Sequence, residues 1–157
     1  MKFIHRIKDE VRGNFPDISA KFEFAGDLSQ INELPDKPGV YILRTPNCSF
    51  VYPWGESNVF YIGMDGVSIN HRVVETHKIH MLSAQENKRK GNSIYYPVYE
   101  YAASRGAECQ YSVCTNKEAW EFEGDLLSRF ATVYGAIPVA NKKHDDFWHR
   151  FPEVEGA

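Results

Sequence analysis

Two short apolar runs, each of which sets a tyrosine beside a glycine, constrain the fold of this chain most strongly. The first covers Gly39–Leu43 and reads GVYIL, and the second covers Val59–Gly63 and reads VFYIG. Short runs of β-branched, aromatic and aliphatic residues bounded by glycine or proline predict strands. The segment between them, 45–57, contains two prolines and a glycine, so it is not regular throughout. We therefore expect an antiparallel strand pair with a long connection.

The rest of the chain alternates between helical and strand periodicity. Apolar spacing predicts helices over about 2–14, 69–86 and 94–102, a short helix from Asp27 or Ser29 to Leu34, and a helix capped by Thr115 or Asn116 that extends to about Thr132. Further strands are predicted at Phe22–Phe24 and Glu108–Thr115. This order predicts an α+β domain, with a small central antiparallel sheet of about three strands flanked by helices.

Length and composition predict a single domain over 1–157. The chain of 157 residues is long enough to bury a core, and it has no run of about 18 apolar residues that would span a membrane. Its three cysteines show no paired metal spacing, and its charged N-terminus lacks the apolar core of a signal peptide, so a reducing, cytoplasmic setting is expected. The net charge of −3 counts against a protein that holds nucleic acid by neutralising phosphates.

Glu123 is the most informative charged residue. On the predicted helix, Trp120, Leu127 and Phe130 lie three, four and seven positions from it, which places Glu123 within an apolar stripe. A carboxylate there is costly unless it is paired or binds a cation. The alternative is that Glu123 lies at the edge of the stripe and reaches solvent.

Taken together, these motifs resemble the GIY-YIG nuclease family. The resemblance lies in GVY at 39–41, YIG at 61–63, an arginine and a histidine on the next helix, a glutamate three residues before Leu126-Leu127, and a closing Pro-x-x-Asn at 138–141. It covers about 34–141, and residues 1–33 would form a helical N-terminal extension. It implies a divalent-metal-dependent endonuclease that hydrolyses phosphodiester bonds.

The resemblance also implies a role for each matching residue. The implied catalytic residues are Tyr41, Tyr61, Arg72, His77, Glu123 and Asn141. Glu123 would hold Mg²⁺ (or Mn²⁺), which retains several waters and accepts a single protein carboxylate. Arg72 would stabilise charge on the phosphate in the transition state, and one tyrosine would activate or orient the attacking water. The candidate substrate-binding positions are Gly63, Lys78 and Lys142.

Two positions depart from the family pattern. Met64 follows YIG where the family often has lysine or a small polar residue. His77 lies five residues after Arg72 rather than four, which on an ideal helix rotates it by about 140° from that arginine. Either the helix begins after Arg72 or bulges, or His80 is the true counterpart.

A second interpretation is a non-catalytic module that uses the same fold to bind nucleic acid or a protein. The resemblance implies DNA as the partner, while the sequence leaves RNA open. Residues 1–33, the aromatic loop with Tyr52 and Trp54, or a separate protein partner would have to supply recognition. Core packing is the alternative for the two loop aromatics.

Overall fold

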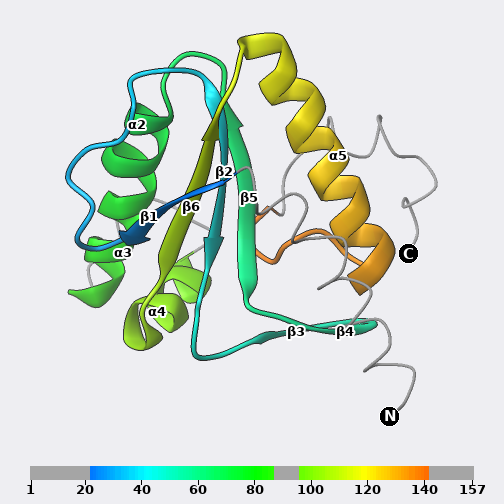
Figure 1. Ribbon diagram of the computed structural model, residues 1–157. Coiled ribbons are helices and arrows are strands. Elements are labelled where there is room, and N and C mark those ends of the chain that lie inside the picture. The colour runs from blue at the N-terminus through cyan, green and yellow to red at the C-terminus, as the bar shows by residue number, and fades with distance from the viewer. Residues whose placement is uncertain (1–21, 87–95, 142–157) are drawn as a thin grey trace.

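A four-stranded antiparallel sheet forms the centre of the protein. A computed structural model describes residues 22–86 and 96–141. The strand order is β1–β6–β2–β5, built from β1 (Glu23–Asp27), β2 (Gly39–Arg44), β5 (Val59–Asp65) and β6 (Glu108–Val113). The two tyrosine runs are β2 and β5, and they pair antiparallel with Tyr41 opposite Gly63 (Figure 1).

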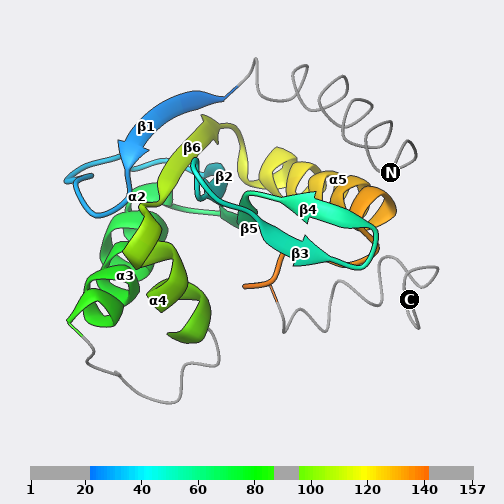
Figure 2. The ribbon, with the colours of Figure 1, turned by 90° about the horizontal axis from the view of Figure 1, so that it is seen from below.

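Helices cover both faces of this sheet. On one side lie α2 (Ile69–Arg72), a π-helical turn η1 (Val73–His77), α3 (Lys78–Gln85) and α4 (Tyr96–Arg105). On the other side lies α5 (Asn116–Tyr134), which Thr115 caps and Gly135 ends in a left-handed conformation. Figures 1 and 2 show the two helical layers on opposite sides of the strands. The predicted α+β class, with a small antiparallel sheet and flanking helices, is confirmed.

Strand alternation divides the side chains between two cores. Val40 and Ile42 pack with α5, whereas Tyr41 and Leu43 pack with the α2–α4 side. Each tyrosine of the two motifs therefore belongs to the face opposite α5. In the part of the chain that the structure describes, no helix combines the length and apolar character needed to cross a bilayer.

Three details differ from the expectation. The sheet has four strands rather than about three, because β1 pairs with β6 along an otherwise open edge. The predicted short helix ending at Leu34 is a turn, in which Asp27 accepts hydrogen bonds from Ser29. Such local bonds compete with helix formation. The loop between the tyrosine strands contains a hairpin of β3 (Phe50–Tyr52) and β4 (Gly55–Ser57). The predicted helix over 2–14 lies outside the described residues.

The segment Pro138–Asn141 covers the exposed edge of β5. Asn141 accepts a hydrogen bond from the Ile62 N–H (3.0 Å) and donates one to the Ile62 carbonyl (2.7 Å). The Ala140 N–H donates to the Phe60 carbonyl, and the Asn141 N–H closes a turn on Pro138. The buried amide of Asn141 thus bonds to β5 as a neighbouring strand residue would, which protects an edge that is otherwise open to pairing. Asn141, which the resemblance names as a catalytic residue, therefore has a structural role on β5.

We expect Asn141→Ala to lower the free energy of unfolding by about 2–3 kcal/mol, because two backbone groups lose their partners. Asn141→Asp should cost at least as much, since it buries a charge and sets an acceptor against the Ile62 carbonyl. Denaturant unfolding measures both. The matched control is Asn116→Ala, which removes one exposed bond to the Gly66 carbonyl and should cost less than about 1 kcal/mol. Equal losses for Asn116→Ala and Asn141→Ala would contradict this account of Asn141.

Candidate active site

Tyr41 and Tyr61 form a stacked pair over Gly63. Their ring centroids lie 5.8 Å apart at an interplanar angle of 10°. A Cβ atom on Gly63 would lie 2.5 Å from the Tyr61 ring and 2.6 Å from the Tyr41 hydroxyl. A Cβ on Gly39 would lie 2.5 Å from the Ser112 carbonyl oxygen on β6. At both motif glycines a Cβ atom would therefore clash with a neighbouring atom, and the absence of a side chain at Gly63 leaves space for the stacked rings.

The π-helical turn η1 explains the five-residue spacing between Arg72 and His77. The Lys78 N–H donates to the Val73 carbonyl, five residues earlier, in place of the usual four. One extra residue per turn offsets the rotation that an α-helix would impose, so His77 turns toward β2. Of the two candidate histidines, His77 contacts Tyr41, while His80 stacks on Tyr99 of α4. Of the alternatives that the sequence left open for this spacing, the structure has the bulged helix.

His77 is buried and neutral between two phenols. Its Nε2 lies 2.7 Å from the Tyr41 hydroxyl and its Nδ1 lies 2.5 Å from the Tyr99 hydroxyl. Burial, the nearby His80 and the positive charge of Arg72 lower the pKa of His77 to about 3. At neutral pH one ring nitrogen therefore donates a hydrogen bond and the other accepts one.

Tyr41 is buried and holds its proton in this state. Burial and the neighbouring Tyr61 raise the pKa of Tyr41 well above its ordinary value, while the positive charge of Arg72 lowers it. Tyr61 is half-buried and also forms a hydrogen bond with Tyr41. Of the two phenols, Tyr61 is consequently the one nearer to solvent.

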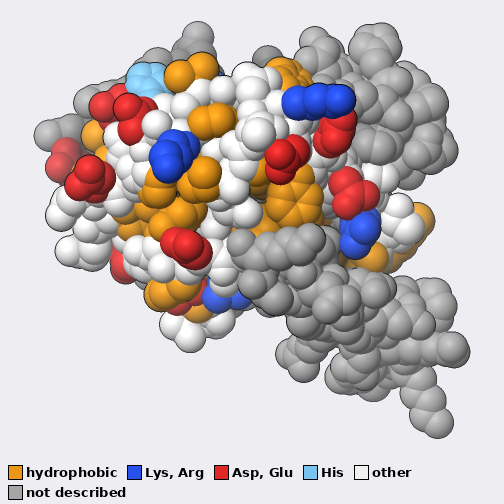
Figure 3. Space-filling view, turned by 45° about the horizontal axis from the view of Figure 1, so that its top comes forward, with side chains coloured by type: hydrophobic (Ala, Val, Ile, Leu, Met, Phe, Trp, Pro, Cys, Tyr) orange, Lys and Arg blue, Asp and Glu red, His pale blue; other side chains and the backbone are white. Residues whose placement is uncertain are grey.

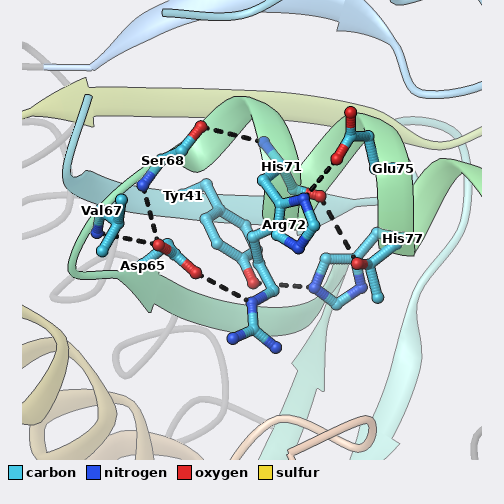
Figure 4. Close-up of polar contacts among 9 residues, drawn as sticks. Tyr41, Asp65, Val67, Ser68, His71, Arg72, Glu75 and His77 are labelled. Carbon is cyan, nitrogen blue, oxygen red and sulfur yellow. Dashed lines mark hydrogen bonds and ion pairs between the residues drawn. The ribbon is translucent and has the colours of Figure 1, made fainter. Parts of the chain in front are cut away.

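Asp65 positions Arg72 beside the cluster of Tyr41 and His77. Its carboxylate accepts hydrogen bonds from the Val67 and Ser68 N–H groups, which shapes the turn into α2, and from Arg72 Nε at 3.2 Å. Burial alone would raise the pKa of Asp65, but these three donors outweigh it and the pKa is lowered. Within residues 22–86 and 96–141, the terminal nitrogens of Arg72 contact no acceptor. Figure 4 shows them pointing away from Asp65, beside the Tyr41 hydroxyl.

No family model, curated protein or solved structure matches this chain. Its chemistry must therefore be argued from its own residues.

Glu123 comes from the opposite layer. It is 7% exposed on the α5 stripe of Ala119, Leu126 and Leu127 that packs against Val40, Ile42 and Ile62. The alternative in which it reaches solvent does not hold. Trp120, which was expected in this stripe, is exposed instead. Met64 packs on the same side as Glu123, away from the tyrosines.

The oxygen ligand that Glu123 offers suits Mg²⁺ or Mn²⁺ better than Zn²⁺. Among the described residues, no group of three or more His, Cys, Asp or Glu side chains could enclose an ion. A lone carboxylate suits Mg²⁺ or Mn²⁺, which keep several waters and take oxygen ligands, rather than tetrahedral Zn²⁺. The residues present are compatible with the metal that the sequence predicts.

Of the two lysines named as candidate substrate-binding positions, the structure describes only Lys78. The Lys78 ammonium is held by the Ile31 carbonyl at 2.7 Å and by Asn32, so it fastens a loop. Lys142 and the cluster Lys88-Arg89-Lys90 lie outside the described residues. Figure 3 shows single basic side chains separated by acidic and apolar ones on the face in view.

Two residues of the site were not singled out as functional from the sequence. Asp65 ends β5, and a carboxylate directly after a strand and before a helix cap is a signal that could have indicated it. Tyr99 was assigned only to the apolar side of its helix. No local pattern distinguishes a buried tyrosine that packs from one that bonds to a histidine on another element.

Proposed function

We propose that this protein is a divalent-metal-dependent endonuclease that hydrolyses phosphodiester bonds in DNA, with a site of the GIY-YIG type. The observation that carries the proposal is the orientation of Arg72, which Asp65 fixes through Nε. Among the described residues both terminal nitrogens remain available, beside a cluster of two phenols and a neutral imidazole. The two terminal nitrogens of a guanidinium can donate parallel hydrogen bonds to two oxygens of one phosphate.

In this proposal one residue stabilises negative charge, and three others take part in proton transfer. Arg72 binds the scissile phosphate and stabilises the negative charge that develops on its oxygens. Tyr61 faces the reacting water, and Tyr41 links it to His77. His77 is neutral, so it has a lone pair with which to accept a proton as the water is deprotonated. Asn141 and Gly63 keep β5 and the tyrosine pair in register.

Glu123 would hold the metal, which when bound supplies Lewis-acid polarisation of the phosphate and stabilisation of the leaving oxygen. The site would therefore draw on both layers that flank β5, since α5 packs against this edge strand and against β2. The three cysteines are free thiols, which fits the proposed cytoplasmic setting.

The competing proposal is a binding module without catalysis, for DNA, RNA or a protein partner. Two observations favour it: the phenol of Tyr41 is buried, with a pKa raised well above its ordinary value, and Lys78 is already engaged. The net charge of −3 also disfavours tight binding to phosphates. We rank it second because the terminal nitrogens of Arg72, which contact no acceptor among the described residues, have no evident purpose in it.

Cleavage of supercoiled plasmid in Mg²⁺ or Mn²⁺ tests the proposal. We expect nicking that chelator abolishes. Glu123→Gln, which removes the charge but keeps the shape, should raise the metal concentration for half-maximal cleavage by about tenfold or more, since even residues behind a ligand cost that much. Glu121→Gln is the matched control, because that exposed neighbour points away from the sheet.

An equal shift in both variants would mean that Glu123 is not the ligand. Binding of plasmid without cleavage, in either metal, would reject the endonuclease and support the binding module.

A further inference from the structure

His77 stands at the centre of a chain of polar groups that extends beyond the residues assigned above. Its Nδ1 lies 2.5 Å from the hydroxyl of Tyr99, a buried residue of α4. Figure 4 shows the opposite ring nitrogen turned toward the Tyr41 hydroxyl. The titratable and charged groups that face His77 from the surrounding elements are Tyr41 of β2, Tyr61 of β5, Arg72 of α2, His80 of α3 and Tyr99 of α4.

The direction of these hydrogen bonds follows from Arg72. The positive charge of Arg72 near Tyr41 repels the hydroxyl proton of Tyr41, which favours an acceptor on the side away from Arg72. The acceptor at 2.7 Å is His77 Nε2. If the Tyr41 proton goes to His77, Tyr61 donates to the Tyr41 oxygen in the bond between the two phenols. A neutral imidazole with a lone pair on Nε2 carries its proton on Nδ1. That proton faces Tyr99, whose oxygen accepts it.

We propose that Tyr99 is a positioning residue, which fixes the tautomer of His77 so that Nε2 is the acceptor for the Tyr41 proton. This inference rests on the proposed nuclease function for its consequence in catalysis. Tyr99 touches neither substrate nor reacting atoms. It acts through His77, as the partner of a catalytic imidazole acts in other hydrolases.

Removing the Tyr99 oxygen leaves the Nδ1 proton buried without an acceptor. The ring then loses its preference for this tautomer, and a fraction of the protein carries the proton on Nε2, where it blocks transfer from Tyr41. Protonation of His77 becomes harder as well, because an imidazolium needs an acceptor at both nitrogens. The rate then depends more strongly on hydroxide in solution.

Tyr99→Phe tests this with two independent measurements. Long-range ¹H–¹⁵N correlation spectra of the full chain without ligand, assigned with His77→Gln, should show the parent protonated on Nδ1 and the variant as a mixture. In plasmid cleavage, kcat should fall about tenfold, and kcat should rise more steeply with pH than in the parent, because hydroxide then replaces the weakened base. Tyr101→Phe, on the same helix with a weak 3.4 Å bond to Ser49, should change neither.

A proton on Nε2 in the parent would overturn the inference, and so would a tautomer and pH profile that Tyr99→Phe leaves unchanged. Should the parent cleave no nucleic acid, the proposed function fails by itself. The spectra of the unliganded protein would still decide whether Tyr99 sets the tautomer.

Discussion

Arg72→Ala is expected to lower plasmid cleavage by about 10²–10³-fold, which is typical of losing one charge-stabilising donor in a transition state. The loss should appear in kcat/KM, because Arg72 contacts the phosphate as charge develops on it. Folding should barely change. The Arg72 side chain is 47% exposed and makes one ion pair, with Asp65. Exposed pairs of this kind contribute about 1 kcal/mol or less, and two backbone N–H groups continue to satisfy Asp65.

The chain offers a closely matched control in Arg129. It too makes one ion pair through Nε, at 3.1 Å to Asp125, and its side chain is 52% exposed, but it lies on the solvent side of α5. Arg129→Ala should change stability as little as Arg72→Ala does and leave cleavage intact. Two variants with the same loss of activity would point to a general electrostatic effect on DNA binding and against a catalytic role for Arg72.

Local signals in the sequence were sufficient for most of the fold. The two short apolar runs bounded by glycine or proline predicted β2 and β5 and their antiparallel pairing. Thr115 or Asn116 was predicted to cap α5, because either side chain can satisfy the first free N–H groups of a helix, and the structure has Thr115 as the cap. The turn at Asp27–Leu34 was predicted as a helix because apolar spacing over eight residues does not reveal side-chain bonds that favour a turn.

The sequence named candidate residues, but it could not give their geometry. The resemblance to GIY-YIG nucleases singled out Tyr41, Tyr61, Arg72 and His77, and the structure brings these four together. The alignment of these four side chains depends on a π-helical turn. The energetic cost of its extra residue is offset by the packing of His77 among three aromatic rings from other elements. Such a tertiary cause has no local signature. The roles of Asp65 and Tyr99 likewise arise only when separate elements meet.

Lowering the pH from about 6.5 should destabilise this protein through His77. The folded-state pKa is lowered to about 3, whereas a histidine in an unfolded chain titrates near pH ~6.5. Between these values the unfolded state binds the proton and the folded state does not, so the free energy of unfolding falls as pH falls. At about 1.4 kcal/mol per pH unit, this amounts to roughly 2 kcal/mol by pH ~5 and about 4–5 kcal/mol by pH ~3. Urea titrations at each pH measure it.

His77→Gln should make the free energy of unfolding less dependent on pH between pH ~6.5 and ~5. This range lies above the titration of most carboxylates. The variant is less stable than the parent at neutral pH, since it loses packing among three rings, but the two curves should converge as pH falls. His80→Gln is the control: burial lowers the pKa of the half-buried His80 as well, so it should remove only the smaller part of the slope. A parent whose stability is constant over this range would show that His77 accepts a proton while folded. The assignment of His77 as a neutral imidazole, on which its role as proton acceptor depends, would then be wrong.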